Sequence, residues 1–154
     1  MRPGERVADF ELPAHDGGTV RLTDELAKGP VVVFFYPRAL TPGCTAESCH
    51  FRDLAGEFAA AGARRIGISA DPVERQQRFS ERNGFDFPLL SDPDRTIAKR
   101  FGVKRPGPLF NRRATFVIDA DGCLLAEISS ETNMNKHADQ ALAVLRDRSG
   151  QAQA

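Results

Sequence analysis

The chain has 154 residues, 41% of them hydrophobic, and its 21 basic and 21 acidic residues give a formal net charge of zero. This balance argues against a basic face for nucleic acid and a polybasic membrane anchor, and the length predicts one folded domain, residues 1–154. No apolar run is long enough to span a membrane, and the N-terminus lacks the apolar stretch of a signal peptide. We therefore expect a cytoplasmic protein whose three cysteines are catalytic or free.

The chain opens with the signals of a β-hairpin. Residues 10–12 and 19–22 are the predicted strands, and the Asp-Gly-Gly sequence at 16–18 is the predicted turn. The next strand is predicted at 31–35, where Val-Val-Val-Phe-Phe is apolar without alternation. That pattern is typical of a strand buried on both faces of a sheet.

A long helix is predicted directly after this strand. Thr41 is a plausible N-cap, Pro42 suits the first helical position, and the helix is predicted to continue through residues 58–61 until Gly62. Cys44 falls in the first turn of this helix. Free N–H groups and the positive end of the helix dipole favour a thiolate there, and the thiolate is the nucleophilic form of cysteine.

Helical geometry separates Cys44 from the second cysteine, Cys49. Cys44 shares a helix face with Phe51, Ala55 and Phe58, whereas Cys49 points about 140° away from that face. Five residues rise about 7.5 Å along a helix, but the Cα atoms of a disulfide lie roughly 4.4 to 6.8 Å apart. If both cysteines take part in one reaction cycle, the first turns of the helix must unwind.

Strand and helix signals alternate through the rest of the chain. The predicted elements are a strand at 65–69, a helix capped by Asp71-Pro72 and ending near 83–84, an extended piece at 87–90, a helix opened by Asp92-Pro93 that buries Ile97, Ala98 and Phe101, an antiparallel pair at 115–119 and 124–128, and a helix with Ala138, Ala141, Leu142 and Leu145 on one stripe. This order favours an α/β, thioredoxin-like fold with a central mixed β-sheet flanked by helices and an N-terminal β-hairpin.

Pro37, Thr41 and Cys44 follow the spacing Pro-x-x-x-Thr-x-x-Cys, which resembles the active-site motif of the peroxiredoxins. The run Thr-Pro-Gly-Cys-Thr-x-Glu-x-Cys at 41–49 looks like the Q-type branch of that family, also called bacterioferritin comigratory protein. Residues 113–119 are similar to the arginine-bearing strand of the family, and the likeness covers nearly the whole chain.

This resemblance implies a thiol-dependent peroxidase. Cys44 would be the peroxidatic cysteine that reduces hydrogen peroxide or an organic hydroperoxide and becomes a sulfenic acid, and Cys49 would resolve it as an intramolecular disulfide. An external dithiol would then reopen the disulfide, so a thioredoxin-like or glutaredoxin-like reductant is implied as a partner. A chance exposed cysteine at position 49 remains the alternative.

The resemblance also implies roles for four further residues. The Thr41 hydroxyl and the Arg113 guanidinium would hold the peroxide oxygens, Pro37 would shield the site from water, and Glu47 would orient Arg113. Thr41 could instead be only a helix cap. Arg112 is the neighbouring candidate, and strand alternation allows only one of the two arginines to enter the site; the family register favours Arg113.

Other reactive side chains are assigned no chemistry. Cys123 follows a turn and is read as structural, although an exposed thiol could cross-link chains. His50 beside Cys49 hints at a metal, but His15, His137 and Cys123 are scattered and form no second ligand pair. We expect no metal and no cofactor. The spacing of four residues between Cys44 and Cys49 also argues against a Cys-x-x-Cys disulfide isomerase.

Two positions depart from the family pattern. Leu40 stands where an acidic residue is common, and residues 104–111 form a loop interrupted by proline and glycine. Leu109 and Phe110 could line an apolar mouth for organic hydroperoxides or pack against the body of the protein. Either a monomer or a homodimer is compatible with the sequence.

Two other classes of function stay open at this point. A redox sensor would oxidise once and report through helix unwinding, and a thiol–disulfide exchange protein would act on protein disulfides without peroxide. A peroxidase would instead turn over many times with reductant.

Overall fold

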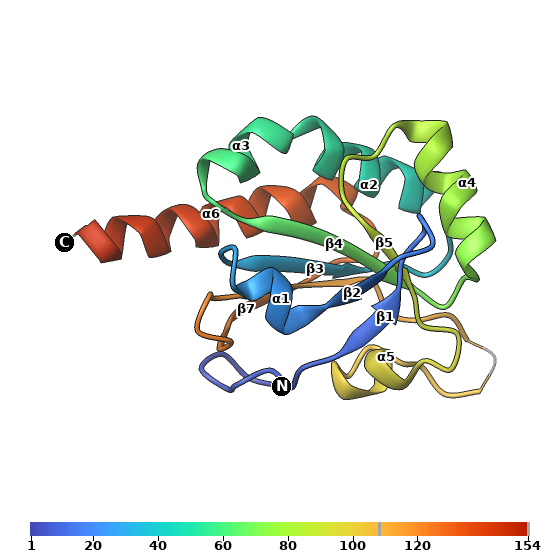
Figure 1. The fold of residues 1–154 in the computed structure, drawn as a ribbon, viewed down its shortest axis with the longest axis horizontal. Coiled ribbons are helices and arrows are strands. Elements are labelled where there is room, and N and C mark those ends of the chain that lie inside the picture. The colour runs from blue at the N-terminus through green and yellow to red at the C-terminus, as the bar shows by residue number, and fades with distance from the viewer. Residues whose placement is uncertain (108, 154) are drawn as a thin grey trace.

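The computed structural model describes the backbone of residues 1–107 and 109–153, with side chains described as far as residue 148. A five-stranded mixed sheet lies at its centre in the order β5-β4-β3-β6-β7 (Figure 1). Its strands are β3 Val31–Phe35, β4 Arg64–Ser69, β5 Leu89–Ser91, β6 Ala114–Ile118 and β7 Leu124–Ser129. The central strand β3 pairs in parallel with β4 and antiparallel with β6, so the predicted mixed sheet is confirmed.

The predicted N-terminal hairpin is also present. Strands β1 (Glu11–Pro13) and β2 (Thr19–Arg21) pair antiparallel, with Leu12 opposite Val20. Gly17 in the turn has a φ of +90°, a conformation that glycine adopts without steric cost. An isolated bridge between Ala14 and Leu90 connects the hairpin to the edge of the main sheet.

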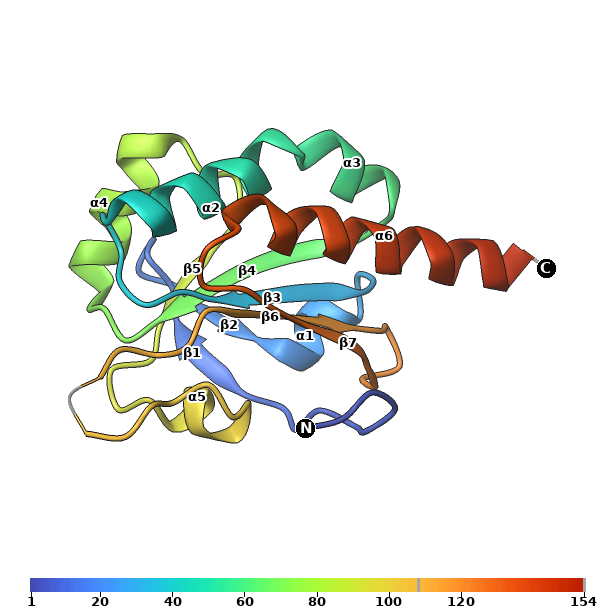
Figure 2. The ribbon, with the colours of Figure 1, turned by 180° about the vertical axis from the view of Figure 1, so that it is seen from behind.

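Helices cover both faces of the sheet. They are α1 Leu22–Leu26, α2 Pro42–Asp53, α3 Ala55–Ala60, α4 Val73–Asn83, α5 Thr96–Arg100 and α6 Met134–Gln153. Helices α2, α3, α4 and α6 lie on one side, while α1, α5 and the hairpin lie on the other (Figures 1 and 2). Across the described residues, none of these helices is both long and apolar enough to span a membrane.

Strand β3 is buried on both faces, as the unbroken apolar run predicts. Val32 and Phe34 belong to the core under α2, α3, α4 and α6, whereas Val33 and Phe35 belong to the opposite core with α5. Phe34 stacks on Phe51 of α2, with ring centroids 4.2 Å apart. This contact fixes α2 over the end of β3 that leads into the cysteine segment.

The predicted single helix from Pro42 to residue 61 is wrong in one respect. The structure breaks it at Leu54, where φ is −94° and ψ is 21°, and a separate helix α3 follows. At the break, Arg65 from β4 donates to the carbonyl oxygen of Phe51 at 2.7 Å, the acceptor that a continuous helix would offer to Ala55. Gly56 further weakens helix formation beyond the break.

The predicted Asp71-Pro72 cap of α4 is confirmed for Pro72 and wrong for Asp71. Asp71 does not cap this helix, which begins at Val73 with Pro72 at the N-cap position. The Asp71 carboxylate instead accepts from the backbone N–H of Ala39 at 2.7 Å and from the Ser69 hydroxyl at 2.6 Å. Asp71 therefore connects β4 to the segment that precedes the cysteine helix.

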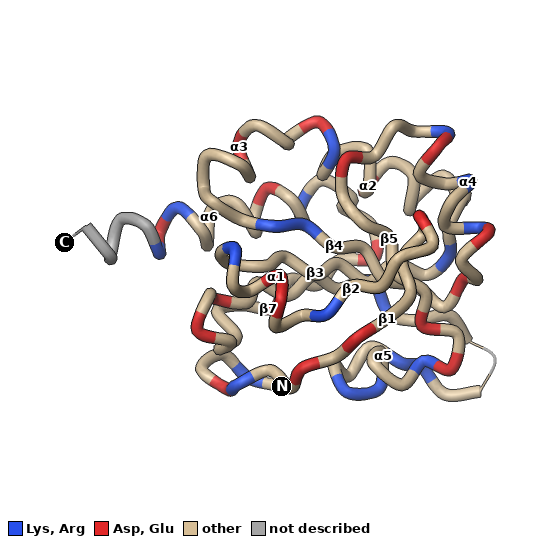
Figure 3. The backbone as a smooth tube through the Cα atoms, viewed as in Figure 1, with Lys and Arg blue, Asp and Glu red and all other residues tan. Residues whose placement is uncertain are grey.

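Helix α6 lies against α2 along its first half (Figure 2). Ala138, Ala141, Leu142 and Leu145 are buried, as their spacing predicts. On the surface of this contact, His50 of α2 pairs with Asp139 of α6 at 2.7 Å. Basic and acidic residues are interspersed over the sheet and helices (Figure 3).

Candidate active site

Cys44 lies in the first turn of α2, on the face that packs toward the sheet, and only 1% of it is exposed. Thr41 occupies the N-cap position, but its hydroxyl makes no capping bond and donates to the carbonyl oxygen of Arg38 at 2.7 Å. Pro42 follows it at the first helical position. Pro37 is half-buried in the same segment between β3 and α2.

Two residues that follow β4, Asp71 and Arg75, hold the backbone of this segment at Ala39. Arg75 donates twice to the carbonyl oxygen of Ala39, at 2.7 and 3.2 Å, and also pairs with Asp71 at 3.2 Å. Asp71 in turn accepts from the N–H of Ala39 at 2.7 Å, so both polar groups of this residue are held. The next residue, Leu40, has a φ of +68°, a conformation that costs a leucine energy and suits Asp or Asn better.

Arg113 lies directly beside Cys44. Its Nη2 donates to the Cys44 sulfur at 3.3 Å, and its Nη1 donates to Glu47 Oε1 at 2.9 Å. Burial lowers the pKa of Arg113, but Glu47 and Cys44 outweigh this and raise it, so the guanidinium stays charged. The Arg112 side chain instead forms an ion pair with Glu127 of β7, with Arg112 Nη2 3.2 Å from Glu127 Oε1. Of the two neighbouring arginines, the structure brings Arg113 to Cys44.

Glu47 is fully buried one helical turn after Cys44. Burial raises the pKa of its carboxyl group to about 8, against the lowering effect of Arg113. One carboxyl oxygen binds Arg113, and the other has no hydrogen-bond partner among the described residues. This places a group that titrates near neutral pH next to the guanidinium at the sulfur.

Gly43 provides the room for this arrangement. A Cβ atom at this position would lie 3.3 Å from Arg113 Nη2 and 3.7 Å from the sulfur of Met134. The absence of a side chain therefore lets the start of α2 approach Arg113 closely. Sequence reasoning did not single out this glycine, although its place directly before Cys44 was the available signal.

Cys49 lies away from Cys44, as the helical spacing predicts. It is half-buried, and its thiol donates to Asn83 Oδ1 of α4 at 3.6 Å. Burial raises the pKa of the Cys49 thiol, so it stays protonated at neutral pH in this conformation. Both cysteines are free, and both lie within the continuous helix Pro42–Asp53. A disulfide between them therefore requires α2 to unwind.

The remaining sequence candidates lie elsewhere. Cys123 is half-buried and its thiol is free. The backbone of Cys123 pairs with that of Arg6 in an isolated antiparallel β-bridge. His15 accepts from the backbone N–H of Leu89 at 3.1 Å. No group of three or more metal-ligating side chains occurs in the part of the chain that the structure describes.

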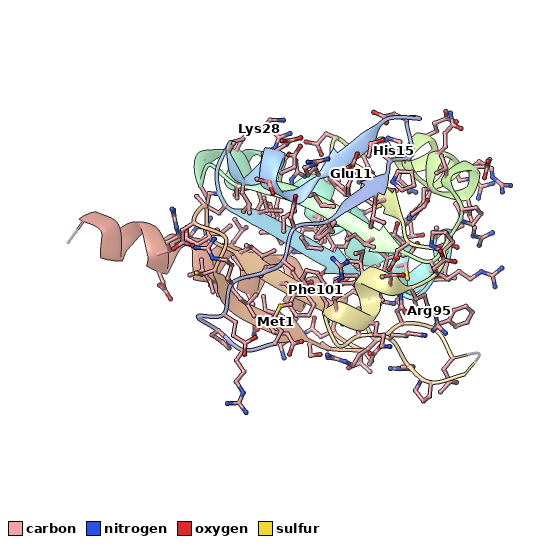
Figure 4. The ribbon with its side chains drawn as sticks, turned by 60° about the horizontal axis from the view of Figure 1, so that its bottom comes forward. Met1, Glu11, His15, Lys28, Arg95 and Phe101 are labelled. Atoms are coloured by element: carbon pink, nitrogen blue, oxygen red, sulfur yellow. The ribbon has the colours of Figure 1, made fainter. Side chains whose placement is uncertain are left out.

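The loop before β6 exposes two large apolar side chains. Leu109 and Phe110 are 54% and 55% exposed, so they do not pack against the body of the protein. The loop backbone is held by Arg95, whose guanidinium donates to the carbonyl oxygens of Leu109 at 2.7 Å and Gly107 at 2.9 Å (Figure 4). Arg38, from the segment before α2, lies 6.0 Å from the Phe110 ring. The Phe110 side chain therefore borders the segment that precedes α2, and Leu109 is its neighbour in the chain.

Comparison with known proteins agrees with this geometry. Residues 3–126 match the model of the AhpC/TSA family. The chain is 36% identical over 153 residues to peroxiredoxin Bcp of Escherichia coli, which covers 96% of this chain and 97% of that protein. The crystal structure of peroxidoxin BcpB from Mycobacterium tuberculosis superimposes with a TM-score of 0.92 at 56% identity, covering 96% and 97% of the two chains.

A third relative is the bacterioferritin comigratory protein of Xanthomonas campestris, at 32% identity and a TM-score of 0.83, covering 90% of this chain and 91% of the other. Its structure was described in relation to alkyl peroxide reduction activity and trapped intermediates. The chain therefore belongs to the AhpC/TSA family, the peroxiredoxins. Within that family it belongs to the Q-type, or bacterioferritin comigratory protein, branch and is a thiol-dependent peroxidase.

Proposed function

We propose that Cys44 is the peroxidatic residue of this enzyme. Its sulfur attacks the terminal oxygen of a peroxide, the O–O bond breaks, and Cys44 becomes a sulfenic acid while water or an alcohol leaves. The contact between Arg113 Nη2 and the sulfur carries this assignment, because a buried positive charge stabilises the negative charge on the sulfur and on the leaving oxygen.

Two groups supply hydrogen bonds to the peroxide in this proposal, and two further residues support them. Arg113 Nε is buried without a partner among the described residues, so one charged donor remains for a peroxide oxygen. The Thr41 hydroxyl already donates to Arg38, which leaves its lone pairs to accept the peroxide proton. Pro37 shields the sulfur from water, and Glu47 holds the other side of the guanidinium.

Cys49 resolves the sulfenic acid in this proposal. Its sulfur attacks that of Cys44, the S–O bond breaks, water leaves, and a disulfide forms. The hydrogen bond to Asn83 and the raised pKa of the Cys49 thiol keep this thiol unreactive while α2 is folded. Unwinding releases both restraints. A thioredoxin-like or glutaredoxin-like dithiol then reduces the disulfide in the cytoplasm.

Turnover with a defined reductant tests this function. With NADPH, thioredoxin reductase and thioredoxin, we expect repeated consumption of hydrogen peroxide by the wild type, none by Cys44→Ser, and loss of most turnover in Cys49→Ser. Cys123→Ser is the matched control and should behave as the wild type. A single oxidation without turnover, under thioredoxin or glutaredoxin, would instead favour a sensor, and activity in Cys44→Ser would refute the assignment.

The exposed pair Leu109 and Phe110 borders this site and gives it an apolar rim suited to organic hydroperoxides. Replacing both with Ser is expected to lower kcat/KM for a bulky hydroperoxide such as cumene hydroperoxide about tenfold and to change kcat/KM for hydrogen peroxide less than twofold, because lost apolar contact is worth about 1 to 3 kcal/mol. Lys104→Ser, at an exposed position of the same loop that carries no apolar side chain, is the control and should change neither value. Equal losses on both peroxides would contradict a substrate rim.

A further inference from the structure

A buried histidine near the start of α6 lies between strand β6 and the Glu47 carboxyl group. His137 has no exposed surface. Its Nε2 lies 2.9 Å from the carbonyl oxygen of Ser130 and 3.4 Å from Glu47 Oε2, and its Nδ1 lies 2.8 Å from the Thr115 hydroxyl. The ring thus connects α6 and β6 to the carboxyl group that holds Arg113.

These contacts define which ring nitrogen carries the proton. A carbonyl oxygen only accepts hydrogen bonds, so Nε2 of His137 must donate to Ser130. Burial lowers the pKa of His137, and the ring is therefore neutral at neutral pH. Nδ1 is then an acceptor for the Thr115 hydroxyl. The Nε2–H group consequently points to Ser130, and Glu47 Oε2 lies 3.4 Å from the same nitrogen.

The two oxygens of the Glu47 carboxyl group thus have different neighbours. Oε1 accepts from Arg113 at 2.9 Å, whereas Oε2 has no hydrogen-bond partner among the described residues and lies 3.4 Å from His137 Nε2. A carboxyl group held on one side only could rotate, and Arg113 would move with it. The His137 N–H donates to Ser130, and Oε2 is its second, longer neighbour, so the positive end of this dipole opposes that rotation electrostatically.

Given the proposed peroxidase function of Cys44, we propose that His137 is a positioning residue of this active site. Its Nε2–H fixes the Glu47 carboxyl group, which in turn fixes the Arg113 guanidinium beside the Cys44 sulfur. His137 itself does not touch the sulfur or the peroxide. This relay adds α6, which carries no residue of the sequence motif, to the elements that set the reactivity of Cys44.

Three variants test the relay through the rate constant for oxidation of reduced enzyme by hydrogen peroxide. His137→Leu removes the donor and is expected to slow the reaction at least tenfold. His137→Gln keeps an N–H group near the Nε2 position and should stay within about threefold of the wild type. His50→Gln is the matched control, because His50 also joins α2 to α6 but pairs with Asp139 at the surface, and its rate should be unchanged.

The pH profile separates positioning from a purely structural role. Glu47 is faced by Arg113 from the segment before β6, His137 from α6, Glu131 from the β7–α6 loop, and Cys44 from its own helix. Losing the His137 N–H disfavours the ionised carboxylate. The inflection that Glu47 causes near pH 8 should therefore move to higher pH in His137→Leu and stay in place in the surface control.

Each outcome has a defined meaning. A folded His137→Leu with the wild-type rate constant and pH profile would overturn the relay. If that variant does not fold, Thr115→Val replaces it, because this change removes only the hydroxyl that orients the ring; a threefold or greater loss of rate is expected, and no loss would overturn the relay. A wild type that does not react with peroxide at Cys44 would refute the proposed function itself.

Discussion

Replacing Arg113 with Gln is expected to slow oxidation of Cys44 by hydrogen peroxide about 10²- to 10³-fold, the usual cost of losing one donor aimed at developing negative charge. Arg113 bonds both the Cys44 sulfur and Glu47, so Gln loses the charge and one of the two contacts. Arg113→Lys should fall in between, since an ammonium keeps the charge but not the planar fork. The rate is measured by competition with a haem peroxidase for hydrogen peroxide.

The neighbouring arginine is the matched control. Arg112 differs from Arg113 by one position but contacts Glu127 at 3.2 Å on the other side of the strand. Arg112→Gln should keep the rate constant within about twofold, because a partly exposed ion pair contributes little. Equal slowing in both variants, or slowing only in Arg112→Gln, would contradict the assignment of Arg113. Thermal melting of each variant checks that it is folded.

Glu47→Gln is expected to remove a pH-dependent loss of stability. In the unfolded chain Glu47 loses its proton near pH 4.5, whereas burial raises the pKa in the folded protein to about 8. Between these values the folded state holds the extra proton, so the contribution of Glu47 to the free energy of unfolding is full below about pH 4.5 and falls as pH rises through 8. Gln at this position does not titrate, so the variant lacks this slope.

One titrating group changes the free energy of unfolding by about 1.4 kcal/mol per pH unit. Relative to Glu47→Gln, the wild type should therefore lose on the order of 3 kcal/mol between pH 5.5 and 8. Urea unfolding of the reduced proteins at several pH values measures the difference. Glu127→Gln, on the exposed face of β7, should keep the wild-type slope. If the free energies of unfolding of the wild type and Glu47→Gln changed with pH in parallel, burial would not raise the pKa of the Glu47 carboxyl group.

The sequence predicted the layout of the fold because its signals are local. The unbroken apolar run of β3, the Asp-Gly-Gly turn and the stripe on α6 each follow from a short stretch of chain. The break at Leu54 did not, because the competing donor is Arg65, which comes from β4. The predicted Asp71 cap of α4 is wrong for a related reason. The Asp71 carboxylate accepts a hydrogen bond from Ala39, which lies between β3 and α2, and no local sequence pattern predicts this contact.

The candidate site divides in the same way. Cys44, Glu47 and Cys49 share one helix, so their spacing defined their relative directions, and a resemblance in the motif brought in Arg113. His137 was weighed only as a scattered metal ligand. Its signal was a polar side chain four positions before Ala141 on an apolar helix face, but its partners lie on β6, on α2 and before α6. Such a contact depends on packing between distant elements.

The central claim is that Cys44 is oxidised first and that α2 unwinds to let Cys49 resolve it. The most direct test is the intact mass and peptide map of reduced protein after one equivalent of hydrogen peroxide, for the wild type and Cys49→Ser. We expect the wild type to lose two hydrogens and form a Cys44–Cys49 cross-link, and the variant to carry a trappable sulfenic acid on Cys44. An oxidised but unbridged Cys44 in the wild type would contradict resolution by Cys49, and an unreacted Cys44 would contradict the whole account.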